Sequence, residues 1–541
     1  MCLRQDRLVD LGFASPDTCR KLRLIIVHYH LRPGGVRRVI ELGTPYLAHG
    51  FKRPIQRVTL ATGESPDLTW RTLFENRMNP VPVDYFIEPS LHYFSQQPLG
   101  PAALRKGIRR ALARLFAATA PDDTLVWAHN LGIARNLILT SELTRICQQK
   151  SITLAAHHHD WWFDNRWIRW PEIRREGSPT LAAAARAVFP KADRVRHLTI
   201  NHADTRVLQP HFKAAWVPNL TERAPDPEPA RVRKARGWLQ QQLNERGAPV
   251  WIVPCRLLRR KNIAEALVLA RWLRPEAWLV TTGDVSSNEE ARYADKLRAA
   301  TRKHRWRLRL GLLAGGEAKK PTVPELVAAS ECLLLTSVQE GFGLPYLEAA
   351  AARQPLIART LPNIAPDLHR FGFQFPQSYD EILVAPGLFD WRAEVRRQCV
   401  LFERWWRCLP RPCRTLAERP ALLEHPHTPR PLAFSRLTLT AQLEVLAHPA
   451  DLSWAQCRRL NPFLDIWQQR AAARSLRISP WPARAVRWLS GRAFARHWTS
   501  AVTAPPGRPP DAVAAAAAQR DFIAEKLQAK YLYPLLWSTE S

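Results

Sequence analysis

The chain has 541 residues, of which 46% are hydrophobic and 21 are tryptophans, so it is too long for one core and too apolar to be largely disordered. Its formal net charge of +31 at pH 7 allows a nucleic acid, an anionic membrane surface or a polyanionic substrate as partner, or simply an arginine-rich proteome. The basic residues are mainly arginines spread along the whole chain, which disfavours a nucleic acid.

Residues 1–20 lack the long apolar run of a secretory signal and carry three aspartates, Asp6, Asp10 and Asp17. No later stretch approaches the roughly 18 to 20 uncharged apolar residues that a membrane-spanning helix needs. The nine cysteines are scattered and include no Cys-x-x-Cys pair, which favours reduced thiols over a disulfide framework or a zinc site. We therefore expect a cytoplasmic protein, with peripheral attachment at the inner face of the membrane as a further option.

An alternation of predicted strands and helices begins at residue 22. The apolar run LRLIIVHYH is typical of a buried strand, and a helical pattern follows after the turn Pro33-Gly34-Gly35. Further predicted strands cover residues 57–61, 124–128 and 152–156, and the clearest predicted helices cover residues 102–118 and 133–148. Such an alternation implies a parallel sheet with helices on both faces.

A strip rich in proline and charge at residues 220–233 marks the predicted domain boundary, because a new strand begins only at residue 249. A second alternating series then runs through WIVPCRLL, AWLVTTGD, RLRLGLLAG and CLLLTSV. The expected fold class is therefore α/β, with two Rossmann-like doubly wound domains, residues 1–219 and residues 220–390, that face a cleft. In open sheets of this kind, ligands bind beyond the carboxyl ends of the strands.

The pattern changes after about residue 390 to helical stretches rich in tryptophan, arginine and proline. Residues 391–541 are predicted to form a mainly helical extension to which the sequence assigns no chemistry, and a docking module for an assembly is one interpretation. After a linker, APPGRPPDAV, a final helix is expected over residues 514–533. Its apolar positions predict that it docks back on the body of the protein.

The strongest constellation lies in SVQEGFGLPYLEAAAARQPLIA. Residues 333–336 end a buried strand, a loop with two glycines follows, and Pro345 opens a helix, so that free N–H groups and the helix dipole suit a diphosphate. Glu340 lies in this loop and Glu348 is expected in the first turn of the helix, where both carboxylates can face one cleft. A glutamate near a helix start is also favoured by the dipole alone.

This segment resembles the Glu-x7-Glu signature of retaining glycosyltransferases, family 4 in particular, which have the GT-B fold. The resemblance implies that Glu340 contacts the transferred sugar and is catalytic, while Glu348 binds the ribose of the donor. The loop expected against the donor's diphosphate consists of Gly341, Phe342, Gly343 and Leu344.

Two cations upstream point to the same chemistry. Arg256 ends a predicted strand and Lys261 follows before a helix, and fixed cations at such a turn can neutralise a leaving diphosphate. Single arginines and lysines in so basic a chain are usually solvated surface, but this pair resembles the family's Arg and Lys at the same spacing, although Asn262 stands where glycine is usual. The Pro-Gly-Gly turn resembles the family's first glycine loop, which implies that Gly35 lies close to the donor phosphates.

The run AAHHHDWWFDNRW follows the predicted strand that ends at residue 156. A metal site is disfavoured, because consecutive residues of an extended chain point alternately to opposite sides. The family has a His-Asp pair at this place, with the histidine near the donor sugar, which implies catalytic roles for His159 and Asp160, while His157 or His158 could hold the histidine's role instead. The neighbouring Trp161, Trp162 and Trp167 could stack on a sugar or simply pack in the core.

The resemblance implies a hexosyltransferase-type glycosyltransferase that retains the anomeric configuration. It is expected to need neither metal nor another cofactor, because cations of the chain stabilise the leaving group and no persuasive Asp-x-Asp motif follows a strand. The expected partners are a nucleotide-diphosphate sugar and a glycan or lipid-linked acceptor, as in cell-envelope polysaccharide biosynthesis, and an anionic membrane surface is a further candidate. The alternative is an inactive glycosyltransferase-like scaffold that binds polyanions or nucleic acid, against which the intact Glu340 and Lys261 argue.

Overall fold

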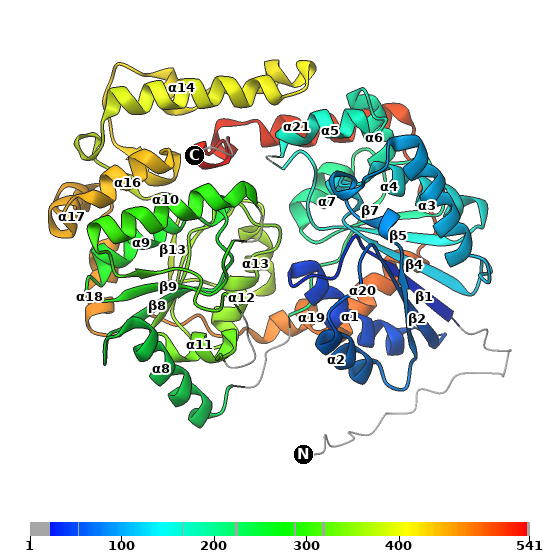
Figure 1. Ribbon diagram of the computed structural model, residues 1–541, viewed down its shortest axis with the longest axis horizontal. Helices are drawn as coiled ribbons and strands as arrows, with labels where there is room; N and C mark the ends of the chain where they lie inside the picture. The colour runs from blue at the N-terminus through cyan, green and yellow to red at the C-terminus, as the bar shows by residue number, and fades with distance from the viewer. Residues whose placement is uncertain are drawn as a thin grey trace.

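The computed structural model describes residues 22–51, 53–164, 166–221, 226–285, 288–315 and 320–537. Two α/β domains lie side by side, each built on a parallel sheet (Figure 1). The predicted fold class, two Rossmann-like domains of the GT-B kind, is thereby confirmed. The predictions for residues 1–20 and for part of the linker at 220–233 lie outside the described residues.

The amino-terminal domain holds a parallel sheet in the order β3-β2-β1-β4-β5-β6-β7. The sequence pattern missed three of its strands, β3, β6 and β7, which are short or only half buried. The strands are β1 (Leu22–Val27), β2 (Ile55–Thr62), β3 (Val83–Ile87), β4 (Thr124–His129), β5 (Thr153–His158), β6 (Val195–Thr199) and β7 (Ala214–Trp216). The helices are α1 (Gly35–Gly50), α2 (Leu68–Met78), α3 (Pro101–Leu115), α4 (Leu137–Gln149), α5 (Trp170–Arg175), α6 (Leu181–Val188) and α7 (His202–Leu208).

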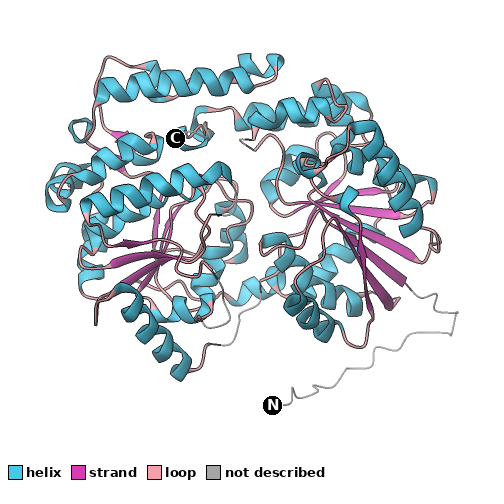
Figure 2. Ribbon diagram, viewed as in Figure 1, coloured by secondary structure: helices cyan, strands magenta, loops and turns pink. Residues whose placement is uncertain are grey.

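The carboxy-terminal domain repeats this design with the strand order β10-β9-β8-β11-β12-β13, and helices enclose the strands of both domains (Figure 2). Its strands are β8 (Val250–Val253), β9 (Trp278–Thr281), β10 (Leu308–Arg309), β11 (Cys332–Leu335), β12 (Leu356–Arg359) and β13 (Gln377–Tyr379). Its helices are α8 (Pro229–Leu243), α9 (Ile263–Leu273), α10 (Asn288–His304), α11 (Val323–Ala329), α12 (Leu344–Ala351) and α13 (Ala365–Phe371).

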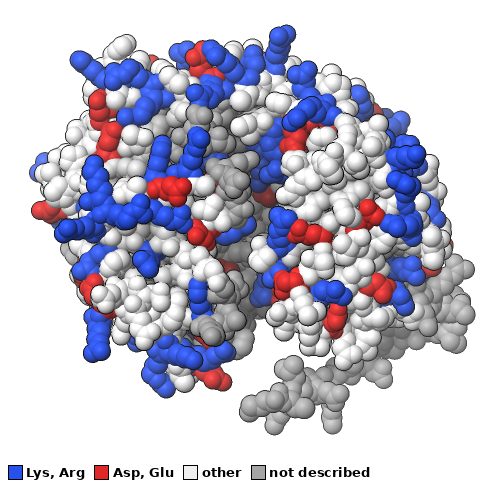
Figure 3. Space-filling model, viewed as in Figure 1, with Lys and Arg blue, Asp and Glu red and all other residues white. Residues whose placement is uncertain are grey.

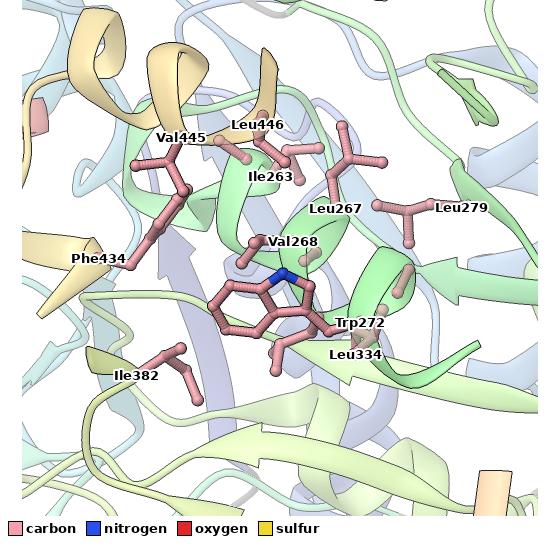
Figure 4. Close-up of a cluster of buried hydrophobic side chains, with 14 of the residues drawn as sticks. Ile263, Leu267, Val268, Trp272, Leu279, Leu334, Ile382, Phe434, Val445 and Leu446 are labelled. Carbon is pink, nitrogen blue, oxygen red and sulfur yellow. The ribbon is translucent and has the colours of Figure 1, made fainter. Parts of the chain in front are cut away.

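The first part of the extension packs on the carboxy-terminal domain. Its elements are α14 (Trp391–Cys408), α15 (Ala421–Glu424), β15 (Leu432–Ala433), α16 (Leu439–Ala447), α17 (Ala450–Cys457) and α18 (Phe463–Ala472), and β15 pairs with β14 (Leu383–Val384), which precedes the extension. Phe434, Val445 and Leu446 of this part meet Val268 and Trp272 of α9 in one buried cluster (Figure 4). The extension therefore completes the core of the domain that carries the predicted donor site.

The chain then returns to the amino-terminal domain through α19 (Val486–Leu489) and α20 (Gly491–Thr503). Helix α20 packs against α1, and its Phe494 and Trp498 join the amino-terminal core beside Trp127. A Cβ on Gly43 of α1 would lie 2.7 Å from the ring of Phe494, so this close approach of two helices requires glycine.

The last helix, α21 (Ala512–Lys526), packs on α6 and α7, and its Phe522 ring lies 5.0 Å from that of Trp161. It ends before residue 533, where the sequence pattern extended it, because the chain is extended at Gln528. The short turns Ala529–Tyr531 and Pro534–Leu536 follow, and the second packs against the turn Arg259–Lys261 of the other domain. We refer to residues 526–537 as the tail. It reaches from one domain to the other.

A chain of charges that begins in the core and ends at partly exposed residues holds the tail. Arg359 at the end of β12 is only 1% exposed and pairs with Glu265 of α9, which is 0% exposed, and with Glu381 at 2.5 Å. Glu381 also pairs with Arg436 at 3.1 Å, whose guanidinium donates to the carbonyl oxygens of Lys530 and Leu532, each at 2.8 Å. Buried charges of this kind stabilise only when each is paired.

None of the helices in the described part of the chain combines the length and apolar character that crossing a bilayer requires. Lysines and arginines are spread across the visible face of both domains, with acidic residues between them (Figure 3). The high net charge is therefore not gathered in one patch on this face.

The charge chain predicts a large stability loss from one substitution. Arg359→Ala would leave Glu265 fully buried without its cation, which costs about 3–5 kcal/mol, whereas Glu381 is partly exposed and would keep Arg436. We expect a lower midpoint of denaturant unfolding. Arg458→Ala, which removes a surface pair with Asp465, should leave the midpoint unchanged. Equal midpoints for both variants would contradict this role of Arg359.

Candidate functional site

Two loops from different domains meet at the carboxyl ends of the sheets. The Glu340 loop follows β11, and His159 and Asp160 follow β5. A Cβ on Gly341 would lie 3.0 Å from the carbonyl oxygen of His159 and 3.6 Å from Oδ1 of Asp160. Asn201 also donates its side-chain amide to the Gly341 carbonyl at 3.4 Å. The structure thus brings these predicted catalytic residues into one cavity, which His159, Asp160 and Glu340 all line.

Glu340 is a buried carboxylate held by two cations. Arg260 pairs with it at 2.7 Å, Lys261 contacts its other oxygen, and the Ser337 hydroxyl donates to it at 2.7 Å. Burial opposes the charge, but Arg260 and Lys261 outweigh burial and lower the pKa of Glu340 to about 2. The sequence analysis missed Arg260, although it directly precedes Lys261. Its role depends on a partner 80 positions away.

The turn before α9 fixes Lys261. Asn262 has a φ of 47°, in the left-handed region that glycine or asparagine adopts most easily, so asparagine fits where the family usually has glycine. The Thr336 hydroxyl donates to the carbonyl oxygens of Lys261 and Asn262 at 3.0 and 3.1 Å. This bond ties the turn to the end of β11, and so to the Glu340 loop.

Arg256 lies on the same edge, after β8, with an exposed side chain. Its aliphatic stem packs against Gly283, where a Cβ would lie 3.0 Å from Cγ of Arg256. Burial and the charge of Arg260 lower the pKa of Arg256, while Tyr93 of the other domain raises it. Arg256 therefore points into the space between the domains.

The loop before α12 has the predicted form, with one correction. Gly343 has a φ of 75°, and α12 begins at Leu344, so Phe342 and the two glycines precede free N–H groups at the helix start. Glu348 is the fifth residue of α12, in its second turn and not in the first turn as expected, because the helix begins one residue before Pro345.

Glu348 nevertheless lies near Lys261 and near Arg38 of the other domain. Its side chain is exposed, yet the nearby protein displaces enough water to raise the pKa of its carboxyl, an effect that Lys261 and Arg38 oppose. Arg38 belongs to α1 of the other domain, so the two domains approach each other here. Gly35, the first residue of α1, is exposed, and a Cβ on it would contact nothing within 4 Å.

The histidine run divides as alternation predicts. His158 stacks on Trp161 at 4.4 Å and contacts His197 at 3.1 Å, away from its neighbours. His157 is fully buried, with Trp127 donating to its Nδ1 at 3.2 Å. His159 alone of the three lines the cavity, and its backbone N–H donates to the Asn130 side chain at 2.8 Å. His159 is therefore the histidine of the run that faces the predicted donor site.

His129 of β4 joins this group, which the sequence analysis did not foresee. Strand pairing sets His129 beside His157, and its Nδ1 lies 3.0 Å from Nε2 of His159. His129, His157 and His159 offer nitrogen atoms within 4.8 Å of one another, a spacing that could hold a metal ion. However, Nδ1 of His157 accepts from Trp127 and its Nε2 lies 3.4 Å from the Val217 carbonyl oxygen, so binding a metal would break one of these contacts.

The three neighbouring tryptophans are core residues. Trp161 and Trp162 are 0% exposed and Trp167 is 1% exposed, so their rings are not available to a sugar. The Trp161 indole N–H instead donates to Asp204 at 2.8 Å. The packing interpretation is therefore the correct one for all three.

The tail supplies residues that no sequence signal indicated. Lys526, Tyr531 and Tyr533 line the same cavity as His159 and Glu340. Although burial opposes its charge, Lys526 has a raised pKa because it pairs with Asp164 at 3.2 Å and lies near Asp204. These contacts join segments more than 300 positions apart in the chain, beyond the reach of any local pattern.

Residues 237–372 match the model of the family described as "Glycosyl transferases group 1". This match supports a glycosyltransferase. The matched region contains Arg256, Lys261, Glu340 and Glu348. Over 358 residues, 63% of the chain, the sequence is 24% identical to mannosylglucosyl-3-phosphoglycerate synthase of Petrotoga mobilis. The alignment covers 65% of that relative, so the chain spans slightly less than two thirds of its length.

Similar solved structures include HepE of Anabaena in complex with UDP and glucose, at 15% identity and a TM-score of 0.49, with 88% of this chain and 98% of that chain covered. A glycosyltransferase from Rickettsia africae has 12% identity and a TM-score of 0.48, with 89% of this chain and 98% of that chain covered.

The buried histidines predict that stability falls at acid pH. Burial lowers the pKa of His157 to about 4, from an ordinary value of 6.5. Between these values the unfolded chain binds more protons, so the free energy of unfolding decreases as the pH falls from about 6.5 towards about 4. Urea midpoints measured between pH 7.5 and 5 should show this loss. His157→Gln, which cannot gain that proton, should lose less, and an equally steep profile would contradict the argument.

Proposed function

We propose that the chain is a retaining, family 4 glycosyltransferase that moves a sugar, of hexose type, from a nucleotide-diphosphate donor to an acceptor. The observation that carries the proposal is the meeting of Glu340, a carboxylate kept charged by Arg260 and Lys261, with His159 and Asp160 of the opposite domain in one cavity. Such a meeting of loops at the carboxyl ends of two sheets is where open α/β folds bind ligands.

In this proposal the diphosphate of the donor lies against Arg256, Lys261 and the loop Gly341–Leu344. Negative charge on the leaving phosphate grows as the glycosidic bond breaks, and fixed cations together with the N-terminus of α12 stabilise it. No metal or other cofactor is needed for this charge stabilisation. Glu348, exposed on the same wall, would hold the ribose.

Glu340 would act on the sugar. Its ionised carboxylate is suited to stabilise the positive charge that develops at the anomeric carbon, while His159 and Asp160 form the opposite wall. The lowered pKa of His159, caused first by burial and then by the neighbouring histidines, keeps its imidazole neutral. Attack of the acceptor hydroxyl on the face from which the phosphate leaves would retain the anomeric configuration.

A polyanion-binding scaffold without activity remains the alternative function. The ion pairs of Glu340 favour an active enzyme over a scaffold. Burying a carboxylate together with two cations costs free energy, and binding of a polyanion would not require that carboxylate. The acceptor we propose is a glycan or a lipid-linked glycan, in a process such as cell-envelope polysaccharide synthesis.

The proposal predicts different kinetic effects for the donor-site residues. Glu340→Gln should lower turnover about 100-fold or more, because it removes an electrostatic contact worth about 2.7 kcal/mol in the transition state. Glu348→Gln should mainly raise the donor KM, because the ribose is bound equally in substrate and transition state. Lys261→Ala should weaken binding of the nucleotide diphosphate and also slow transfer. Steady-state kinetics and calorimetry would measure these effects.

Three controls sharpen this experiment. His159→Ala should reduce turnover while free nucleotide-diphosphate affinity stays nearly unchanged. Rates should be the same in chelator, and carefully purified protein should contain no stoichiometric zinc, since the histidine group is expected to bind none. Full turnover by a folded Glu340→Gln variant, with every donor that the wild type accepts, would exclude the catalytic role and favour the scaffold.

We also propose that the protein works in the cytoplasm and associates with an anionic membrane surface. The support is the net charge of +31 of the whole chain, together with the many lysines and arginines on the face that Figure 3 shows. Cosedimentation with anionic vesicles is expected at low salt and should fade as salt screens the attraction. Vesicles of neutral lipid serve as the control. Equal binding to both would contradict the proposal.

A further inference from the structure

A half-buried arginine of the amino-terminal domain, Arg135, has no role in the proposed donor site. Arg135 lies between the turn Leu131–Ile133 and α4, with its guanidinium carbon 5.0 Å from the centre of the Tyr93 ring. Its Nε is buried and has no hydrogen-bond partner among the described residues. A buried charged donor without an acceptor is costly. The rest of the guanidinium belongs to a partly exposed side chain, and this is the part that an acceptor from outside the chain can reach.

The backbone holds Arg135 and Tyr93 together. The N–H of Phe94 donates to the carbonyl oxygen of Arg135 at 2.7 Å, and the Asn136 side chain donates to the carbonyl of His92 at 2.8 Å. Ala134, just before Arg135, has a φ of 51°, which costs energy for a residue with a Cβ. These hydrogen bonds hold the side chains of Arg135 and Tyr93 next to each other, and the strained backbone at Ala134 is part of the free-energy cost.

The charges around Arg135 do not balance. Arg169 already pairs with the nearest acid, Glu172, at 2.8 Å. Arg166 lies 3.7 Å from Asp160 and donates to the Trp161 carbonyl oxygen at 3.4 Å, and the Arg166 and Asp160 side chains are both partly exposed. Glu176 is no counter-ion at neutral pH, because burial raises its pKa to about 8. Positive charge is therefore in excess at this place.

Arg135, Tyr93 and Arg166 lie next to the proposed sugar site. The contact of Arg166 with Asp160 connects them to the wall formed by His159 and Asp160. The Tyr93 hydroxyl lies 2.9 Å from Nε2 of His30, and Tyr93 is close enough to Arg256 of the other domain to raise the pKa of that guanidinium. An anion at Arg135 would therefore lie beside the reacting sugar but on the amino-terminal side of the cleft.

We infer that Arg135, with Tyr93 and Arg166, binds an anionic group of the acceptor, of the phosphate-monoester class. The inference rests on the proposed function, because it assigns this site to the acceptor of the transfer. Guanidinium groups match the geometry of an oxyanion with paired N–H donors, and a phosphate monoester has three terminal oxygens that can accept from Arg135 and Arg166 together, where a carboxylate has two.

Inorganic phosphate is the probe that tests the inference. In calorimetric titration of the full chain, Arg135→Gln should weaken phosphate binding at least tenfold. Arg145→Gln, on the outer side of α4 and paired with Glu142 at 2.8 Å, is the matched control and should bind phosphate like the wild type. Acetate should bind at least tenfold more weakly than phosphate. Equal binding of phosphate and acetate would contradict the inference that the anionic group is a phosphate monoester.

Two further measurements separate this site from a structural role and from the donor site. Arg135→Gln should keep or raise the thermal midpoint, since it removes a half-buried cation without an acidic partner, whereas a structural arginine would lower it. Its affinity for UDP should stay unchanged, while Lys261→Ala should lose UDP affinity and keep the phosphate site. Unchanged phosphate binding by Arg135→Gln, or a matching loss of UDP binding, would overturn the inference.

The outcome is distinguishable from failure of the proposed function. Phosphate binding is measured without a donor and without transfer. A chain that loses phosphate binding in Arg135→Gln but never releases a nucleotide diphosphate from any donor would support the anion site and contradict the transferase. A chain that transfers sugar while Arg135→Gln binds phosphate normally would support the transferase and contradict the inference.

Discussion

The site depends on one buried carboxylate that stays ionised. Glu340 keeps its charge because Arg260 and Lys261 approach it from the turn before α9 and together outweigh the cost of burial. The same turn is bonded to the end of β11 through Thr336, so the loops after β8 and β11 form one unit. The loop that follows Glu340 contacts the backbone of His159, and this contact joins the charged centre to the opposite domain.

The extension is structural support for this centre. Helix α20 completes the amino-terminal core, α16 to α18 cover α9, and the tail passes from one domain to the other beside the cavity. Charged residues hold the tail at both ends. Lys526 pairs with Asp164 at one end, and Arg436, which pairs with Glu381, donates to the carbonyl oxygens of Lys530 and Leu532 at the other. Movement of the two domains relative to each other would therefore have to bend or release the tail.

Net charge is less informative than the local balance of charges. Many arginines of this basic chain pair with acids or backbone carbonyls, as Arg169 does with Glu172, and contribute to packing. Arg135 differs because its Nε is buried without a partner among the described residues, and two of its charged neighbours, Arg166 and Arg169, are also cations. A ligand is expected to bind where a charged side chain has no oppositely charged partner within the protein. The sequence does not show which side chains these are.

The sequence by itself determined the local order of elements. Alternating apolar runs indicated two parallel sheets, and the glycines and Pro345 placed Glu340 in a loop before a helix, because these signals act over a few residues. Tertiary structure alone decided which residues meet, because strand order and packing set the contacts between residues that are distant in the chain. These contacts bring His129 beside His159, Arg260 onto Glu340 and Lys526 to the cavity, and they bury Trp161, Trp162 and Trp167. The structure also fixed where α12 begins, which places Glu348 in its second turn. Periodicity predicts which face of an element is apolar, but not what that face meets.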